Sequence, residues 1–436
     1  MIVMKFGGSS VANTEMIKGV AGIVKSQVKK KPIVVVSALG GVTNDLIEAA
    51  TFAANGSGTK KCDEITGRHL AVIKELGLGE QIIGDEVSQL RREMEKIGAG
   101  RNLNQKSLDT VMSFGERMSA RIVAACLVSV GVNSKAYDAF NIGLVTDSSF
   151  GNANPLPKAS SMIRRSLSGV SGVPVVTGFI GKDRVGNITT LGRGGSDYTA
   201  SLIGMAVRAK EIQIWTNTNG VLTADPRIVS GALNIRDLSY EEELELEYLG
   251  ANTLHPKGIR PAFEKNITVR VLNTLHPKES DTVIKSRINE KMRVASITHK
   301  DGMHIILLRA QDPPKRLHDV FDIIRRHGIS IDSVLTSRTD IMIIFSGYYN
   351  GNIKDALKEL GSVGKVSIRS GRAKISVVGK ALFSIPGISG KIFSSLADMP
   401  IEAISYGSSG MSQSFFVKEQ HAGTAIRKLH RTFFGA

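Results

Sequence analysis

The first two thirds of the chain alternate between short apolar runs and longer segments with helical periodicity. The apolar runs predict strands at residues 2–6, 33–37, 134–138, 173–179, 211–216 and 268–272. Because helical patterns separate these runs, the chain is expected to form a mostly parallel sheet with helices on both faces. In such sheets ligands bind at the carboxyl ends of the strands.

Two other segments interrupt this alternation. Residues 56–105 are polar and helical in pattern, and we expect them to form an insertion that shields one side of a ligand site. Residues 276–281, His-Pro-Lys-Glu-Ser-Asp, have the composition of a linker. The alternating region is therefore expected to end near residue 280.

An internal repeat follows this break. Pro314, Phe321, Ile329 and 343–345 recur at a constant offset, and their counterparts are Pro386, Phe393, Ile401 and 415–417. Each copy has the order strand, helix, strand, strand, helix, which predicts two ferredoxin-like βαββαβ units. The expected domains are residues 1–280, 281–365 and 366–436.

The composition narrows the class of protein. The formal net charge of +16 is compatible with a nucleic-acid partner, but the basic residues are dispersed and aromatic residues make up only 5%. The densest basic cluster, Lys29–Lys31, ends a predicted helix, where cations complement the helix dipole. We therefore expect anionic small-molecule substrates and no nucleic acid.

The expected location is the cytoplasm. No apolar run approaches the roughly 20 residues needed to span a bilayer, so no membrane association is expected. Met1 leads directly into the first strand, which leaves no room for a signal peptide. Cys62 and Cys126 are too few for a disulfide framework or a cysteine metal site, and both are expected to be reduced.

The stretch 190–200, Thr-Leu-Gly-Arg-Gly-Gly-Ser-Asp-Tyr-Thr-Ala, carries the strongest functional signal. A strand ends here, glycines permit a tight turn, and Ser196 and Asp197 are N-cap residue types ahead of a helix. A helix N-terminus after a glycine-rich turn favours an anion, and Arg193 adds a planar fork suited to a carboxylate or phosphate. An ordinary polar turn is the alternative.

A second glycine-rich turn, Gly7-Gly8-Ser9-Ser10, follows the first strand and places Lys5 near a potential phosphate. With 190–200, this turn resembles the aspartokinases of the amino acid kinase superfamily. The resemblance extends over nearly the whole chain and includes Val34–Ala38, Ser113–Arg117, Val176–Phe179, Thr223–Arg227 and Leu254–Pro256.

The resemblance implies transfer of the ATP γ-phosphoryl group to the side-chain carboxylate of aspartate, with Mg²⁺. The product, 4-phospho-L-aspartate, begins lysine, threonine and methionine biosynthesis. The repeats resemble paired ACT domains, which implies an amino acid effector and a homodimer or a dimer of dimers. Domains that act in dimerisation alone are the alternative. A hard cation bound mostly by water and phosphate would leave no protein ligand cluster to find.

The resemblance also assigns residue roles. Lys5 is expected to stabilise the transferring phosphoryl group, and Asp197 to orient Lys5. Arg193 is expected to pair with the α-carboxylate of the acceptor and Glu116 with its ammonium. The other expected substrate-binding residues are Ser37, Thr43, Asn44 and Ser196. The expected nucleotide-binding residues are Lys5, Gly7, Gly8, Ser9, Gly194, Gly195, Thr216, Asn217, Leu222, Asp225, Arg227 and Asn252.

Some positions depart from the family's pattern. Asn217 replaces an aspartate, Leu222 a tyrosine and Asn252 a lysine, so ATP affinity or nucleotide preference is open, with Lys257 as a candidate replacement for the missing lysine. In the first repeat the effector candidates Ser330 and Asp332 are kept. Lys315 and Arg338 add positive charge there, which favours threonine over lysine as an effector.

Two alternatives to an aspartokinase are compatible with the fold. One is a kinase for another carboxylate or a carbamate, such as glutamate or N-acetylglutamate. The other is a regulatory paralogue without catalysis. The presence of Lys5, Glu116, Arg193 and Asp197 argues against the second alternative.

Overall fold

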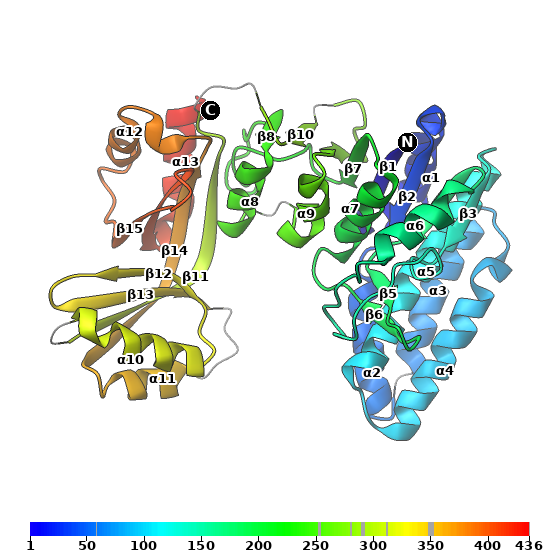
Figure 1. Cartoon of the computed structure of the whole chain (residues 1–436), viewed down its shortest axis with the longest axis horizontal. Helices are drawn as coiled ribbons and strands as arrows, with labels where there is room; N and C mark the ends of the chain where they lie inside the picture. Colours follow the sequence, from blue (N-terminus) through cyan, green and yellow to red (C-terminus); the bar gives the residue numbers. More distant parts are fainter. Residues whose placement is uncertain are drawn as a thin grey trace. The chain divides into compact units, whose positions relative to one another are not determined.

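The computed structural model describes residues 1–57, 59–251, 254–279, 281–288, 293–310, 313–347 and 353–435. The chain divides into two units (Figure 1). The first unit contains Met1–Val221, Asn234–Leu244 and Thr253–Ile288; the second contains Leu222–Leu233, Glu245–Asn252 and Asn289–Ala436. Two short segments from within the expected domain 1–280 therefore belong to the second unit.

An eight-stranded sheet in the order β3-β4-β2-β1-β7-β9-β10-β8 forms the first unit. Neighbouring strands are parallel from β3 to β9, β10 is antiparallel to β9, and β8 is parallel to β10. The prediction of a mostly parallel sheet is confirmed, and each predicted strand is present. The strands are β1 (Ile2–Phe6), β2 (Pro32–Val36), β3 (Ser134–Tyr137), β4 (Val173–Thr177), β7 (Glu211–Thr216), β8 (Asp237–Ser239), β9 (Thr268–Asn273) and β10 (Thr282–Lys285).

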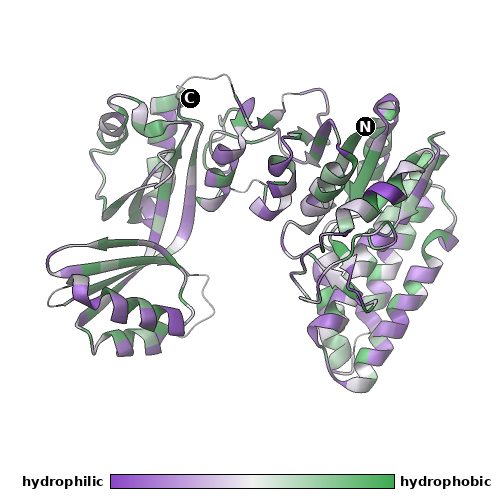
Figure 2. Cartoon of the chain, viewed as in Figure 1, coloured by the Kyte–Doolittle hydropathy of each residue, from purple (hydrophilic) through white to green (hydrophobic). Residues whose placement is uncertain are grey.

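The central strands are apolar because both of their faces are covered. Every residue of β2 and β4 is buried, as expected for parallel strands between helical layers. Figure 2 shows β2 in green, at the place where Figure 1 labels it. A short antiparallel hairpin, β5 (Ile180–Lys182) and β6 (Ile188–Thr190), leads into the glycine-rich turn.

The helices pack against different parts of this sheet. The long helix α5 contacts β2, β3 and β4, whereas α7 contacts β1, β2 and β7, with α6 and α9 against α7. The helices are α1 (Thr14–Ser26), α2 (Val42–Ala54), α3 (Thr59–Glu75), α4 (Gly84–Gly100), α5 (Gln105–Ser129), α6 (Ala159–Ser168), α7 (Gly195–Val207), α8 (Tyr240–Tyr248) and α9 (Pro256–Glu264).

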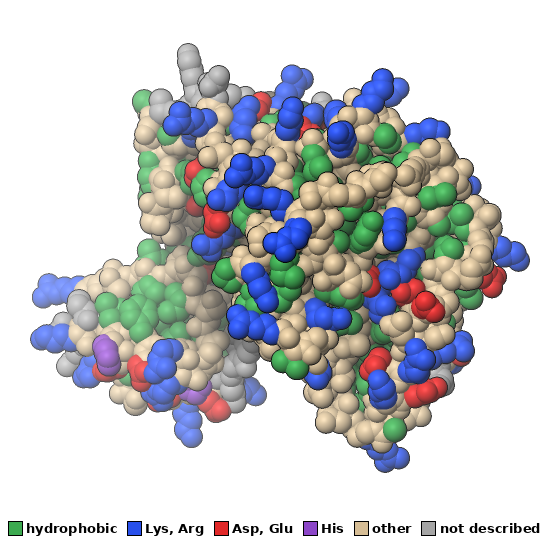
Figure 3. Space-filling model, turned by 45° about the vertical axis from the view of Figure 1, so that its right-hand side comes forward, with side chains coloured by type: hydrophobic (Ala, Val, Ile, Leu, Met, Phe, Trp, Pro, Cys, Tyr) green, Lys and Arg blue, Asp and Glu red, His purple; other side chains and the backbone are tan. Residues whose placement is uncertain are grey.

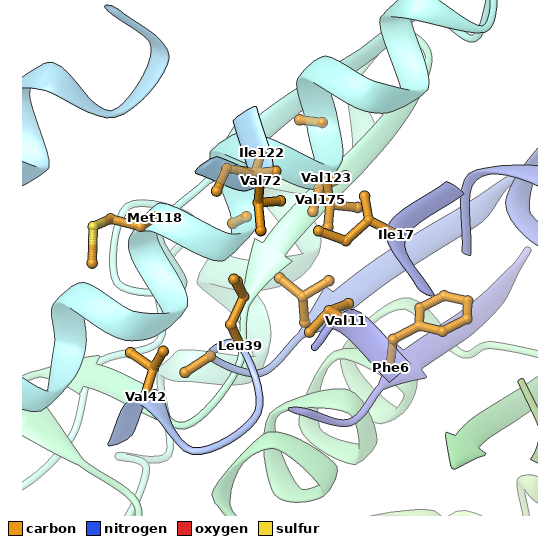
Figure 4. Close-up of a cluster of buried hydrophobic side chains, with 14 of the residues drawn as sticks. Phe6, Val11, Ile17, Leu39, Val42, Val72, Met118, Ile122, Val123 and Val175 are labelled. Carbon is orange, nitrogen blue, oxygen red and sulfur yellow. The ribbon is translucent and has the colours of Figure 1, made fainter. Parts of the chain in front are cut away.

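The predicted insertion at 56–105 forms α3 and α4, which pack against α2 and α5. Val72 of α3 shares one apolar core with Phe6 of β1 and Val175 of β4 (Figure 4). Buried ion pairs from Arg117 and Arg121 of α5 reach Glu86 of α4. The insertion is therefore an integral part of the first core.

A six-stranded antiparallel sheet, β12-β13-β11-β14-β16-β15, forms the second unit. Its strands are β11 (Ser296–Arg309), β12 (Ile331–Thr336), β13 (Asp340–Ser346), β14 (Lys365–Val378), β15 (Ala403–Tyr406) and β16 (Ser412–Lys418). The helices α10 (Pro313–Arg326) and α11 (Ile353–Leu360) pack with one half of this sheet, and α12 (Ile388–Ser395) and α13 (Glu419–Phe434) with the other half.

The two repeats are joined more closely than two consecutive βαββαβ units would be. Residues 303–309 of β11 pair with β13 and with the first half of β14, and so belong to the first repeat. Residues 296–300 pair with residues 374–378 of β14, which pair in turn with β16. The fourth strand of the second repeat therefore precedes the first repeat in the sequence. The predicted order of two consecutive βαββαβ units is corrected in this respect, because the long strands β11 and β14 each pair with strands of both repeats.

The part of the chain that the structure describes has no helix that is both long and apolar enough to cross a membrane. Cys62 and Cys126 are buried and free. On the face shown in Figure 3, Lys and Arg side chains are spread over the surface.

Candidate active site

Lys5 and Asp197 meet at the carboxyl edge of the parallel sheet. Lys5 lies at the end of β1, and Asp197 lies in the first turn of α7. Lys5 Nζ is 2.6 Å from Asp197 Oδ1, and the two side chains are 12% and 14% exposed. This ion pair holds a cation in front of the glycine-rich turn while leaving it accessible to a ligand.

Gly194 determines where α7 begins. Its φ of 69° is left-handed, and it is the N-cap of the helix, which starts at Gly195. A Cβ on Gly194 would lie 2.6 Å from His255 Cβ, so no side chain fits there. Ser196 and Asp197, expected at the N-cap, lie in the first turn instead. The reversal at Gly194 makes a side-chain cap unnecessary and frees Asp197 to pair with Lys5.

The N-terminal turn lies against the same space. Gly8 begins a 3-10 helix that runs to Val11. A Cβ on Gly8 would be 3.1 Å from the Ala38 carbonyl oxygen, so the turn approaches the loop after β2 closely. Ser9 is exposed, whereas Ser10 is buried and its hydroxyl bonds to Trp215 O and Thr274 Oγ1.

These elements enclose a cavity of about 360 Å³. Its lining includes both glycine-rich turns, the loop after β2 and Glu116 of α5, but none of the described residues of the insertion at 56–105. The expectation that the insertion shields the site is therefore not supported by the lining. The predicted site residues that line the cavity are Lys5, Gly8, Ser37, Thr43, Glu116, Arg193, Gly194, Gly195, Ser196 and Asp197. Gly7, Ser9 and the exposed Asn44 lie nearby in sequence but do not line it.

Glu116 is a buried acid that faces this cavity. Its residue is 3% exposed, and in the described structure Oε2 has no hydrogen-bond partner. Burial raises the pKa of Glu116 to about 8, although N–H groups of Ala38 and of Glu116 itself partly offset the rise. Gly115 allows the close packing, since a Cβ there would be 2.7 Å from Ala38 Cβ. Glu116 is therefore suited to a cationic ligand group.

Arg193 and Ser37 supply the complementary polar groups. Arg193 is exposed, and none of the described residues forms a hydrogen bond or ion pair with its guanidinium. Ser37 Oγ donates to Ser196 Oγ at 3.0 Å, which links the loop after β2 to α7. The cavity thus combines a free guanidinium, a buried carboxyl and neutral hydroxyl groups.

Asp109 was not found by the sequence analysis. It is fully buried on α5, two helical turns before Glu116. Asp109 Oδ2 accepts the N–H groups of Gly151 and Thr190, both at 2.8 Å, and Oδ1 accepts Gln105 Nε2 at 3.0 Å. Thr190 directly precedes the glycine-rich turn. The same helix therefore carries Glu116 and anchors the base of the turn that carries Arg193. No local motif marks Asp109, because its partners are distant in sequence.

Lys257 secures the other side of that turn. Its ammonium donates to Asn152 Oδ1 at 2.7 Å, Leu191 O at 2.9 Å and Ala153 O at 3.3 Å. Burial lowers the pKa of Lys257. Because its donors are engaged within the protein, the structure does not favour Lys257 as a replacement for the lysine missing at 252.

The predicted nucleotide-binding residues are divided between the two units. Thr216 ends β7, and Asn217 is exposed beside it. Leu222, Asp225 and Arg227 belong to the second unit. There the guanidinium of Arg227 donates two hydrogen bonds to Asp225 Oδ2. The Arg227 side chain is 81% exposed. Asn252 lies outside the described residues.

Comparisons with known proteins agree with this fold. The amino acid kinase family profile matches residues 1–273, and an ACT domain profile matches residues 375–433. The first match covers more than half of the chain, so the fold is that of an amino acid kinase.

Aspartokinase 1, chloroplastic, from Arabidopsis thaliana is 36% identical over 99% of this chain and 80% of its own length. Escherichia coli aspartokinase III in complex with aspartate and ADP (R-state) has a TM-score of 0.82 and 28% identity, with 100% of both chains covered. Its complex with lysine and aspartate (T-state) also has a TM-score of 0.82 and 28% identity, over 100% of this chain and 99% of that chain. The chain therefore belongs to the aspartokinases within the amino acid kinase family.

The raised pKa of Glu116 predicts a pH-dependent affinity for an amino acid ammonium. Pairing requires the ionised carboxylate, whereas the empty site keeps Glu116 protonated below about pH 8. Affinity should therefore increase as pH rises toward 8, by up to about tenfold per unit. Calorimetric titration with aspartate between pH 6.5 and 8.5 measures this slope. Glu116→Gln should bind more weakly with little pH dependence, and a flat wild-type profile would contradict the assignment.

Asp109 is expected to act through Arg193. Asp109→Asn removes the negative charge that holds the N–H groups of Gly151 and Thr190 at the base of the turn, and we expect the aspartate KM to rise about tenfold with a smaller change in kcat. In an Arg193→Ala background, which itself raises the aspartate KM, Asp109→Asn should add little. Asp183→Asn is the matched control, because Asp183 accepts the N–H groups of Val185 and Asn187 at the far end of the same hairpin. If Asp109→Asn raised the aspartate KM by the same factor in both backgrounds, Asp109 would not act through Arg193, and this would contradict the assignment.

Proposed function

We propose that the chain transfers the γ-phosphoryl group of ATP to the side-chain carboxylate of L-aspartate, giving 4-phospho-L-aspartate and ADP. The observation that carries this proposal is a single cavity lined by Glu116, Arg193 and the Lys5–Asp197 pair. The aspartate and ADP named for the E. coli structure support the same substrates. The product would begin lysine, threonine and methionine biosynthesis.

The acceptor is bound by its amino acid end. Ionised Glu116 pairs with the α-ammonium, and Arg193 takes the α-carboxylate through two parallel hydrogen bonds. Ser37 and Thr43 add neutral hydrogen bonds from the cavity wall, and Asn44 is retained as a weaker candidate. With both charged groups at the α-carbon held, the side-chain carboxylate is the group left to react.

Transfer forms a bond between a side-chain carboxylate oxygen and the γ-phosphorus. The bond from that phosphorus to the bridging oxygen breaks, and ADP leaves with the electron pair. No proton moves, so the protein's contribution is positioning and charge stabilisation. Lys5 stabilises the charge on the transferring group, Asp197 orients Lys5, and N–H groups of Gly8 and Gly194 hold phosphate oxygens. The N–H of Gly195 donates to Gly192 O at 3.0 Å, so Gly195 stays a prediction for the phosphates.

Mg²⁺ would neutralise phosphate charge in this reaction. Among the described residues no three His, Cys, Asp or Glu side chains form a metal-binding group. A hard cation held mainly by phosphate oxygens and water needs few protein ligands, and Asp197 is the carboxylate in the cavity suited to contact its shell. The nucleoside end is assigned to Thr216 and Asn217, with Leu222, Asp225, Arg227 and Asn252 retained as predictions. Gly7 and Ser9 stay predictions for the phosphates.

The alternative functions are less well supported. The relatives that match over nearly the whole chain are aspartokinases, which does not favour glutamate or N-acetylglutamate as the acceptor. A paralogue without catalysis would not need the Lys5–Asp197 pair at 2.6 Å. Location in the cytoplasm stays a prediction.

A panel assay tests the proposal directly. Purified chain, Mg-ATP and single amino acids are incubated with hydroxylamine, which traps an acyl phosphate as a hydroxamate. We expect a signal with aspartate and none with glutamate or N-acetylglutamate. Lys5→Met should abolish turnover while ATP binding persists, because the lost contact matters most in the transition state. A hydroxamate with glutamate alone, or near-normal turnover by Lys5→Met, would refute the respective assignment.

A homodimer through the repeats belongs to the same proposal. The edge strands β12 and β15 have backbone groups that are free to pair with a second chain. We favour β12, because the effector candidates Ser330 and Asp332 lie at or beside it. Light scattering over a range of concentrations should give at least twice the chain mass of 46.8 kDa. A monomeric mass throughout would contradict the pairing.

A further inference from the structure

Asp332, the predicted acidic effector residue, already has a cationic partner. Lys374 Nζ lies 2.7 Å from Asp332 Oδ1, and the two side chains are only 4% and 6% exposed. Ser333 Oγ donates to the same oxygen at 3.1 Å. Asp332 falls at an irregularity of β12, between Ile331 paired with Phe345 and Ser333 paired with Ile344. The pair joins β12 of the first repeat to the part of β14 that belongs to the second.

The surroundings of Lys374 are those of an ammonium-binding site. Its ammonium is 5.5 Å from the ring centre of Tyr248 and 5.9 Å from that of Phe416. One carboxylate with two aromatic rings is a chemical environment that recognises a primary ammonium through charge and cation–π attraction. An amino acid effector carries such an ammonium.

We propose that the ammonium of Lys374 acts as an intramolecular ligand of this site, and that it prevents a free amino acid from binding Asp332. A free ligand would have to displace an ammonium that is attached to the same sheet and therefore present at high effective concentration. The wild-type chain is thus expected to respond to neither lysine nor threonine through Asp332. This specifies the regulation within the proposed function, although the binding test below does not depend on catalysis.

Removing the lysine charge should turn this internal pair into a ligand site. Lys374→Met keeps an unbranched apolar side chain but leaves a buried carboxylate without its partner. A free ammonium can then restore the lost pairing. We expect the variant to bind lysine or threonine at least about tenfold more tightly than wild type, and tenfold corresponds to about 1.4 kcal/mol.

The experiment titrates L-threonine and L-lysine separately into the full-length chain, by calorimetry in the absence of ATP and aspartate. Lys374→Met is compared with wild type and with Lys374→Met/Asp332→Asn, which removes both charges. The gain should appear in the single variant and disappear in the double variant. Equal affinities in wild type and the single variant would overturn the proposal, as would a gain that survives loss of the Asp332 charge.

A second variant guards against a folding defect. Lys374→Gln removes the charge but can still donate a hydrogen bond to Asp332, so it should fold if Lys374→Met does not. It should show a smaller gain in affinity that also requires Asp332, and a folded Lys374→Gln with no gain would overturn the proposal. Initial rates of aspartyl phosphate formation form a separate readout. Binding without inhibition would leave the site assignment intact, whereas absence of any phosphate transfer would count only against the proposed function.

Discussion

The ion pair between Lys5 and Asp197 is the interaction on which the site depends. It joins the end of a central parallel strand to the first turn of α7, across a distance of 2.6 Å. The pair exists only because Gly194 reverses the chain before the helix and places Asp197 on the side of β1. The sheet, the turn and the helix therefore fix one cation at the position proposed for the transferring phosphoryl group.

Helix α5 sets the opposite wall of the same site. Its face carries Glu116, buried and only partly satisfied by backbone N–H groups, and Asp109, which holds the strand end before Arg193. Ion pairs from Arg117 and Arg121 connect α5 to Asp138, which follows β3, and to Glu86 of α4. The groups assigned to the ammonium and the α-carboxylate are thus positioned by one helix, and this is the basis that we propose for selective binding of an α-amino acid.

The features of the fold and the site that short sequence patterns encode could be predicted from the sequence. The parallel strands and the two glycine-rich turns follow from local residue types, whereas the pairing of Asp197 with Lys5 was expected from the family resemblance. Asp109 and Lys374 could not be predicted in the same way. Asp109 binds Thr190, and Lys374 binds Asp332, only after distant strands and helices have packed.

Chain connectivity was also beyond local patterns. The repeat pattern indicated two consecutive units, yet residues 296–300 complete the second repeat from ahead of the first, because strand order in a sheet depends on long-range pairing. The segment 222–233 lies among catalytic motifs in sequence but packs with the second unit, where Ala224 and Val229 join its core. Burial in a particular core is a tertiary property that a motif does not encode.

The central claim is that Glu116 and Arg193 hold both charged groups at the α-carbon, so that only the side-chain carboxylate reaches Lys5. Borohydride reduction of the enzymatic product identifies which carboxyl group was phosphorylated. The reaction with aspartate and Mg-ATP is quenched with borohydride, which reduces the acyl phosphate to an alcohol. The resulting hydroxy amino acid is identified by chromatography against standards. Phosphorylation of the side chain gives homoserine, the result that the account predicts. Formation of 3-amino-4-hydroxybutanoate would show transfer to the α-carboxylate and would contradict the assigned orientation.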